Sequence, residues 1–187
     1  MRKIFLIFLL CTTSLFAQKI YLQKSQIQFG DGDTFTANGV IIRVLGVDTP
    51  EVKNLEHKIL VNQYLGPEAS EFTKKLITKS KSIYYVPFQK DRYSRTLAHV
   101  FIDDELLSIK IIEAGLGYET VSTYGDNGYP ALAKQIKAAA TKAGKPNFTN
   151  PMYWRRKNIK REKNDKNKRS KSHRNNHGRK LKMGKSK

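Results

Sequence analysis

The sequence predicts a small α+β domain, because strand patterns come first along the chain and helix patterns are interspersed later. Asn38-Gly39 lies between two β-rich runs within residues 34–47, which is the strongest short-range signal for a β-hairpin. Helical spacing of apolar residues follows Pro67 and again Pro130. Residues 18–154 are long enough to bury one hydrophobic core, so we expect a single domain over this range.

The predicted hairpin fixes which residues face each other across its two strands. In a two-residue turn the numbers of paired residues sum to 77, which places Thr34 opposite Arg43 and Asp33 opposite Val44. This register brings Asp33 and Arg43 close together at one end of a sheet. The second strand is expected to continue to Asp48, because the Thr49-Pro50 pair that follows would stop it.

The other elements follow from capping residues and from the spacing of apolar side chains. Residues 52–66 are polar and irregular and predict a mobile surface loop. Pro67 stands at a first helical position, and Glu68 and Glu71 lie in the first turn, where acids favour a helix. The remaining expected elements are strands at 20–29, 83–88 and 95–102 and helices at 106–115 and 130–143.

The formal net charge of +19 is concentrated at the C-terminal end of the chain. Residues 155–187 hold 16 of the 35 Lys and Arg residues and only two acids, with almost nothing apolar among them. Such a segment buries too little surface to offset its ordering entropy, so we expect it to be disordered. We expect this tail to bind nucleic acid or an anionic envelope, and the alternative is a tail that only confers solubility.

Residues 1–17 have the layout of a secretory signal peptide. Arg2 and Lys3 precede an apolar stretch, small and polar residues follow it, and the simplest cleavage site lies after Ala17. Cys11 is the only cysteine, so the mature chain holds no disulfide and no thiolate site. We expect an exported protein that is secreted, periplasmic or associated with the cell surface, with no transmembrane segment in the mature chain.

Five charged residues near the predicted strand ends form a candidate catalytic group. Asp33 precedes a strand, Asp48 and Glu51 follow its partner, and Arg43 and Arg95 lie at strands nearby. Hard divalent cations take carboxylate and carbonyl oxygens, and two guanidinium groups suit a phosphodiester whose oxygens gain charge during attack by water. The acids and Arg95 each have an ordinary structural interpretation, such as a turn or a solvated strand end, whereas Arg43 in an apolar strand needs a partner or an open pocket. The hypothesis therefore rests on the combination.

The sequence resembles the staphylococcal nuclease (thermonuclease) family. The resemblance covers roughly residues 26–154, and it implies a five-stranded OB-type β-barrel with three helices. It also implies a Ca²⁺-dependent nuclease of DNA and RNA that leaves 3′-phosphate ends. The motifs that carry it are DGDT at 31–34, IIRVLGVDTPE at 41–51, YLGPEASEFTKKL at 64–76, DRYSRTLAHVF at 91–101 and IIEAGLGY at 111–118.

The resemblance assigns a role to each residue of the candidate site. Asp33 and Asp48 correspond to the calcium carboxylates, and Thr49 to a residue that supplies a backbone oxygen. Glu51 corresponds to the acid that orients or deprotonates the attacking water, and Arg43 and Arg95 to the arginines that bind the scissile phosphate. The expected substrate contacts are Lys90, Arg92, Tyr93 and Tyr124.

The sequence differs from the family pattern at two places, and two other functions also fit it. The first hairpin is shorter than in the best-known family member, and Ser94 stands where the family usually has a glycine. A non-catalytic nucleic-acid-binding OB module is one alternative, and an envelope-associated polyanion binder is the other. His57 and His99 are expected to be solvated or packed in the core, not catalytic. We expect a monomer.

Overall fold

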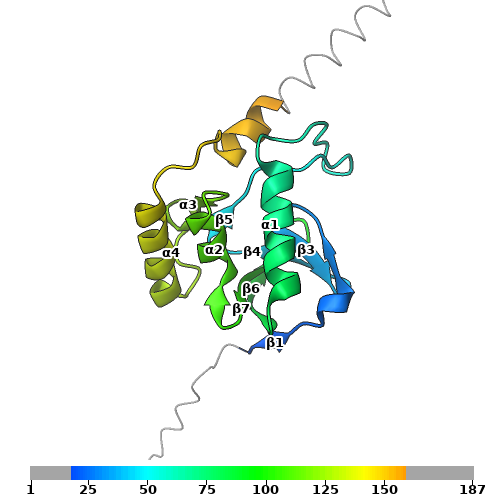
Figure 1. Ribbon diagram of the computed structural model, residues 1–187, viewed down its shortest axis with the longest axis vertical. Helices are drawn as coiled ribbons and strands as arrows, with labels where there is room; N and C mark the ends of the chain where they lie inside the picture. Colours follow the sequence, from blue (N-terminus) through cyan, green and yellow to red (C-terminus); the bar gives the residue numbers. More distant parts are fainter. Residues whose placement is uncertain (1–17, 159–187) are drawn as a thin grey trace, which may run out of the picture.

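The computed structural model describes residues 18–158, so the predicted signal peptide and most of the basic tail lie outside the described residues. Most strands come early in the chain and the α-helices are interspersed from residue 66 onward, as the sequence predicts (Figure 1). The strands are β1 (Ile20–Tyr21), β2 (Ile27–Phe29), β3 (Thr34–Ala37), β4 (Val40–Val44), β5 (Val47–Asp48), β6 (Ile83–Lys90), β7 (Thr96–Ile102), β8 (Glu105–Leu106) and β9 (Tyr118–Glu119). The helices are η1 (Lys24–Gln26), α1 (Gly66–Lys79), α2 (Leu107–Glu113), α3 (Val121–Tyr124) and α4 (Pro130–Ala143), and residues 151–158 are also helical.

Seven strands form one curled sheet in the order β1–β6–β7–β4–β3–β2, with β8 paired to β7. The sheet curls into a half-barrel, which confirms the predicted α+β class and OB-type architecture. β4 and β7 pair in parallel, with Arg43 beside Leu97, whereas the other neighbours in the sheet are antiparallel. The parallel pair joins the first hairpin to the second, and it therefore places Arg43 near the start of β7.

The register of the first hairpin is the predicted one. Thr34 pairs with Arg43, and the Val44 N–H donates a 2.8 Å hydrogen bond to the Asp33 carbonyl. Asn38 and Gly39 take φ angles of 51° and 76°, which is the left-handed geometry that a two-residue hairpin turn requires. The local sequence signal thus fixes the relative positions of Asp33 and Arg43.

The second hairpin strand was expected to run unbroken to Asp48, and this prediction is wrong. The strand stops at Val44, and a short separate strand, β5, pairs with β9 in a two-stranded sheet. Gly46, between the two strands, has φ of 86°, and a Cβ there would lie 2.5 Å from Cδ1 of Ile136 in α4. The chain turns at Gly46 because only glycine accepts this backbone angle against a closely packed helix. The turn thus places Asp48 in a strand outside the main sheet.

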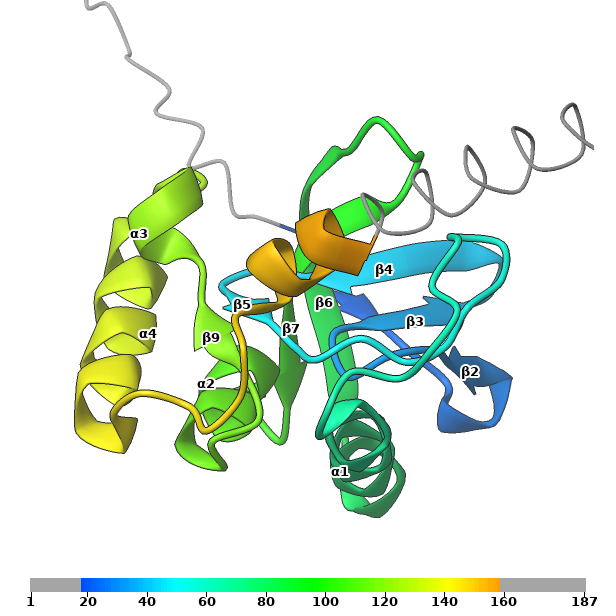
Figure 2. The ribbon, with the colours of Figure 1, turned by 90° about the horizontal axis from the view of Figure 1, so that it is seen from above.

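Helices α1, α2 and α4 pack against the curled sheet. Buried apolar side chains from β3, β4, β7, α2 and α4 form one core. Helix α2 lies beside α4 (Figures 1 and 2). α1 begins at Gly66–Pro67 as predicted, and α4 has the predicted bounds. Residues 20–29, expected as one strand, form β1 and β2 with η1 between them. The helix count exceeds the three implied by the family resemblance, because α3 and residues 151–158 are also helical.

Residues 151–158 extend the described structure beyond Trp154, where the sequence analysis placed the end of the domain. These helical residues lie over β4 and β5 (Figure 2). Among them Arg155, expected as the first residue of a disordered tail, is therefore part of the described structure. Across residues 18–158, no helix has both the length and the apolar character needed to cross a bilayer.

Candidate active site

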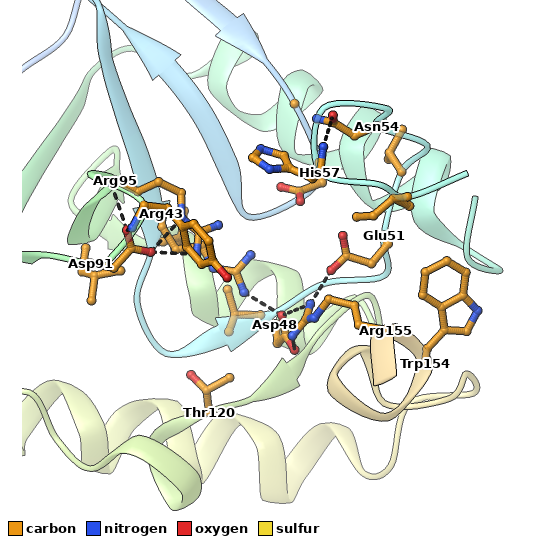
Figure 3. A pocket seen from close by; sticks show the side chains of 18 of the residues that line it. Arg43, Asp48, Glu51, Asn54, His57, Asp91, Arg95, Thr120, Trp154 and Arg155 are labelled. Atoms are coloured by element: carbon orange, nitrogen blue, oxygen red, sulfur yellow. Dashed lines mark hydrogen bonds and ion pairs between the residues drawn. The ribbon is translucent and has the colours of Figure 1, made fainter. Parts of the chain in front are cut away.

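One cleft of about 1800 Å³ is lined by four of the five charged residues of the sequence hypothesis: Arg43, Asp48, Glu51 and Arg95 (Figure 3). The fifth, Asp33, is fully buried. The walls of the cleft come from β4 and β5, the loop that follows Asp48, the β6–β7 turn, Tyr124 at the end of α3, and the helix of residues 151–158. Segments far apart in the sequence thus meet around one cleft.

Arg43 links two buried carboxylates at the base of the cleft. Its Nη1 donates to Asp33, and its Nη2 donates to Oδ1 of Asp48 at 2.6 Å. Asp33 is fully buried, and its second oxygen accepts a 2.7 Å hydrogen bond from the Thr49 backbone N–H. A buried carboxylate is costly unless it is paired, so this network explains how both acids remain in the interior. The hairpin register and the turn at Gly46 bring the partners together.

Asp48 is held as a carboxylate by two guanidinium groups. Burial pushes its pKa upward, but the charges of Arg43 and Arg155 outweigh this effect and leave the pKa below its ordinary value. Oδ2 of Asp48 accepts a 3.0 Å hydrogen bond from Arg155, and Oδ1 accepts one from each arginine. Both oxygens of this carboxylate therefore face cationic donors.

Glu51 lies beside Asp48 and is 5% exposed. Burial raises the pKa of its carboxyl group, the charge of Arg155 opposes that rise, and the nearby charge of Asp31 adds to it. Arg155 Nη1 donates to Oε1 of Glu51. A buried carboxylate of raised basicity that opens onto a cleft has the properties of a general base.

The backbone of Glu51 is clamped by Gln63, a buried residue that the sequence analysis did not single out. The Gln63 N–H donates to the Glu51 carbonyl at 2.8 Å, and its side-chain oxygen accepts from the Glu51 N–H at 3.3 Å. Its side-chain nitrogen donates to the Thr149 carbonyl. One side chain thus ties the loop after β5 to the segment that leads into the last helix.

Arg95 reaches the cleft from the start of β7 and is fixed by Asp91. Its Nε and Nη2 both lie 2.8 Å from Oδ2 of Asp91, and Asp91 Oδ1 accepts the backbone N–H groups of Tyr93 and Arg95. The guanidinium also lies 5.5 Å from the centre of the Tyr93 ring. These contacts order the arginine while leaving its side chain half-buried at the cleft wall.

The expected substrate contacts divide into those that line the cleft and one that does not. Arg92, Tyr93 and Tyr124 line it, and both tyrosines are more than half exposed. Lys90 lies at the end of β6 and is exposed, but it is not among the lining residues. The exposed rings are suited to stacking on bases, because every base has a π face.

The two histidines that the sequence analysis set aside lie in different environments. His57 lines the cleft from the exposed loop. His99 is buried in β7, and both of its ring nitrogens lack hydrogen-bond partners among the described residues. The core placement of His99 is confirmed, but its polar atoms are not satisfied there.

The oxygen donors at and beneath the base of the cleft fit the chemistry of a hard divalent cation such as Ca²⁺. Asp48 lines the cleft and Asp33 and Thr49 are buried beneath it, and all three offer oxygen atoms. The Oδ1 atom of Asp31 is buried and has no hydrogen-bond partner within residues 18–158. Residues 18–158 contain no cluster of three or more Asp, Glu, His or Cys side chains gathered closely enough to hold a metal. Two carboxylates would therefore have to be supplemented by backbone or water oxygens.

Three residues of the site were missed at the sequence level: Gln63, Asp91 and Arg155. Asp91 carried a local signal, because an acid four residues before Arg95 across a tight turn can accept its backbone and its guanidinium. Gln63 and Arg155 act through partners 86 and 104 residues away, and no local pattern marks such contacts.

Comparison with known proteins agrees with the site geometry. The family model described as Staphylococcal nuclease homologue matches residues 41–149. A thermonuclease of Staphylococcus intermedius is 35% identical over 127 residues, which cover 65% of this chain and 71% of that protein. A thermonuclease of Staphylococcus hyicus is 38% identical over 91 residues, covering 46% of this chain and 52% of that protein. The SPbeta prophage-derived endonuclease YokF of Bacillus subtilis is 33% identical over 109 residues, which cover 51% of this chain and 35% of that protein. The chain therefore belongs to the staphylococcal nuclease homologue family.

Proposed function

We propose that this protein is an exported, Ca²⁺-dependent nuclease that hydrolyses phosphodiester bonds of DNA and RNA and leaves 3′-phosphate ends. The observation that carries the proposal is that Arg43, Arg95, Asp48 and Glu51 line one cleft, with Asp33 directly beneath it. Two relatives named thermonuclease and one named endonuclease support the same reaction class.

In the proposed reaction Glu51 orients a water molecule and accepts its proton as the water oxygen bonds to phosphorus. The bond from phosphorus to the 5′-oxygen breaks, and that oxygen leaves and takes up a proton from solvent. Arg43 and Arg95 donate hydrogen bonds to the phosphate oxygens as their negative charge increases. Asp33, Asp48 and the Thr49 carbonyl would hold the calcium ion, which when bound supplies further positive charge at the phosphate.

Exposed aromatic and basic side chains at the cleft would hold the nucleic acid without reading its sequence. Tyr93 and Tyr124 are placed to stack on bases, and the Arg92 guanidinium lies 4.8 Å from the centre of the Tyr93 ring. Base stacking tolerates any sequence, and arginine and lysine bind phosphates wherever they occur. This combination supports a nuclease of broad specificity that accepts DNA and RNA.

Export and location are part of the same proposal. The predicted signal peptide would deliver the enzyme as a monomer to the periplasm, the cell surface or the medium, and the basic tail would retain it on nucleic acid or an anionic envelope. Mass spectrometry of the protein recovered from outside the cytoplasm tests the first part. The proposal expects a mature chain that begins near Gln18.

Digestion of plasmid DNA and RNA by the purified protein tests the activity. We expect cleavage of both with Ca²⁺, little or none with chelator, and products that carry 3′-phosphate and 5′-hydroxyl groups. Mg²⁺ serves as the comparison cation. Binding of nucleic acid without cleavage in any of these conditions would instead identify a non-catalytic binding module.

A further inference from the structure

Arg155 fills the position between two carboxylates that the proposed chemistry requires to be accessible. Its guanidinium donates to both oxygens of Asp48, at 3.2 and 3.0 Å, and to Oε1 of Glu51 (Figure 3). With Arg43 also on Oδ1 of Asp48, every oxygen of that carboxylate is paired with a guanidinium. Arg155 thus makes three contacts to the proposed metal ligand and general base.

The helix that carries Arg155 is held over the cleft by the segment before it. The Tyr118 hydroxyl donates to the Phe148 carbonyl at 2.7 Å, and the Gln63 side chain donates to the next carbonyl, Thr149. The Asn150 side chain then accepts the Met152 N–H at 3.0 Å and starts the helix. This anchoring makes the contact of Arg155 a feature of the fold and gives its guanidinium a high local concentration at the carboxylates.

A guanidinium and a divalent cation compete for the same carboxylate oxygens. Two positive charges within about 4 Å of each other repel strongly where water is partly excluded, and Asp48 is 6% exposed. Arg43 is held in β4 by its strand neighbours, whereas the helical residues 151–158 that carry Arg155 pair with no strand among the described residues, so Arg155 is the group that can leave.

We propose that Arg155 is an internal competitor of the divalent cation, which neutralises Asp48 and Glu51 in the cation-free protein and leaves when the cation binds. The inference rests on the proposed Ca²⁺ site. By linkage, displacement of Arg155 and cation binding favour each other to the same extent. Cation loading therefore frees the last helix and exposes Glu51 to the attacking water, so the C-terminal segment restrains the site until the cation is present.

Calorimetric titration with Ca²⁺ tests the proposal in the full mature chain. Arg155→Gln removes the competing charge, and Arg156→Gln is the matched control, because Arg156 is the exposed neighbour on the same helix. We expect Arg155→Gln to bind Ca²⁺ at least roughly fivefold more tightly than the wild type, the lower end of typical coupling between sites. Arg156→Gln should match the wild type at 0.15 M salt, where distant surface charges are largely screened.

The only tryptophan of the chain provides a second readout that does not depend on catalysis. Trp154 immediately precedes Arg155 and lines the cleft. Its fluorescence should change as Ca²⁺ is added to the wild type, with a midpoint equal to the calorimetric one, and should change less in Arg155→Gln. Circular dichroism confirms that each variant is folded, and Arg155→Lys, which keeps the charge without the two-pronged contact, should bind with intermediate affinity.

The possible results separate this inference from the proposed function. Equal Ca²⁺ affinity in the wild type and Arg155→Gln, or weaker binding in Arg155→Gln, would overturn the competitor role while leaving the metal site intact. Failure of Ca²⁺ to bind any of the variants would overturn both the inference and the proposed cofactor.

Discussion

Gln63 shows how the site depends on a residue that touches no reacting atom. Its main chain and side chain pair with the carbonyl and the N–H of Glu51, and its amide nitrogen reaches Thr149. A buried side chain with these contacts limits where the Glu51 carboxylate can lie. Such a positioning role affects the rate of the chemical step more than the binding of substrate.

Replacing Gln63 with alanine should therefore lower kcat about tenfold or more, since small displacements of a catalytic group have large effects on rate. KM should change little. Asn62→Ala is the matched control, because Asn62 accepts the Lys53 N–H at 2.7 Å in the same loop without touching Glu51. Steady-state kinetics on both variants, corrected for the folded fraction, make the comparison. An equal loss in both variants would mean that Gln63 only stabilises the loop.

His99 should make the protein less stable in mild acid. Burial without a hydrogen-bond partner lowers its pKa from 6.5 to about 4, so the unfolded chain binds this proton more readily than the folded protein. Stability is therefore retained above pH 6.5 and is lost as pH falls from 6.5 towards 4, by about 3 kcal/mol. Denaturant unfolding of the wild type and His99→Leu between pH 4 and 7 measures this contribution. A wild-type curve no steeper than that of the variant would contradict the assignment.

At the scale of elements, the start of α1 packs directly behind the site. A Cβ on Gly66 would lie 2.3 Å from the carbonyl oxygen of Glu51, a contact that no backbone atom tolerates without moving. Gly66 therefore allows a close approach between the helix and the loop that carries the proposed general base. The turn at Gly46 also shapes the site, because it separates β4 from β5, the strand that ends at the cleft-lining Asp48.

We expect Gly66→Ala to lower both the free energy of unfolding and kcat, because the loop must shift to admit the methyl group. The loss of stability should be about 1–3 kcal/mol, the usual cost of overpacking. Gly144→Ala is the comparison, since Gly144 has φ of 77° but no atom within 4 Å of its Cβ position. That variant should lose stability through backbone strain and keep its kcat. An unchanged kcat in Gly66→Ala would show that Glu51 tolerates movement of its backbone.

Local patterns predicted the elements well, and tertiary contacts account for the differences. The Asn38-Gly39 turn fixed the hairpin register, and the Pro67 and Pro130 signals located α1 and α4. The break at Gly46 was missed because the apolar run around it also fits one long strand. It is imposed by packing against Ile136, which lies 90 positions later in the chain.

At the scale of the whole molecule, the family resemblance predicted the OB-type architecture and gave the site residues their proposed roles, because those residues lie in recognisable local motifs. The contacts of Arg155 could not be predicted, since its segment appeared only as the beginning of a charged tail. Guanidinium–carboxylate pairing across 104 residues depends on the fold that brings both ends together. Composition alone described the tail as basic and could not separate its first residues from the rest.

Deletion of residues 159–187 should weaken substrate binding at low salt and flatten its salt dependence. These residues carry 13 Lys and Arg, and each phosphate contact they make releases counterions. Affinity for single-stranded DNA measured between 50 and 200 mM salt gives the slope for the full chain and the truncated one. The truncation leaves residues 151–158, Arg155 among them, in the chain, so every described residue of the site is retained. Equal slopes would assign the tail to another partner, such as an anionic envelope.

The central claim is that the cleft hydrolyses phosphodiester bonds with Glu51 as the group that accepts the proton from water. The most direct measurement is kcat for DNA cleavage with Ca²⁺ by Glu51→Gln, beside Glu113→Gln, which removes an exposed acid at the end of α2. We predict that Glu51→Gln lowers kcat by about 100-fold or more, the usual contribution of a general base, and that Glu113→Gln leaves it unchanged. A folded Glu51→Gln variant with the kcat of the wild type would contradict the claim.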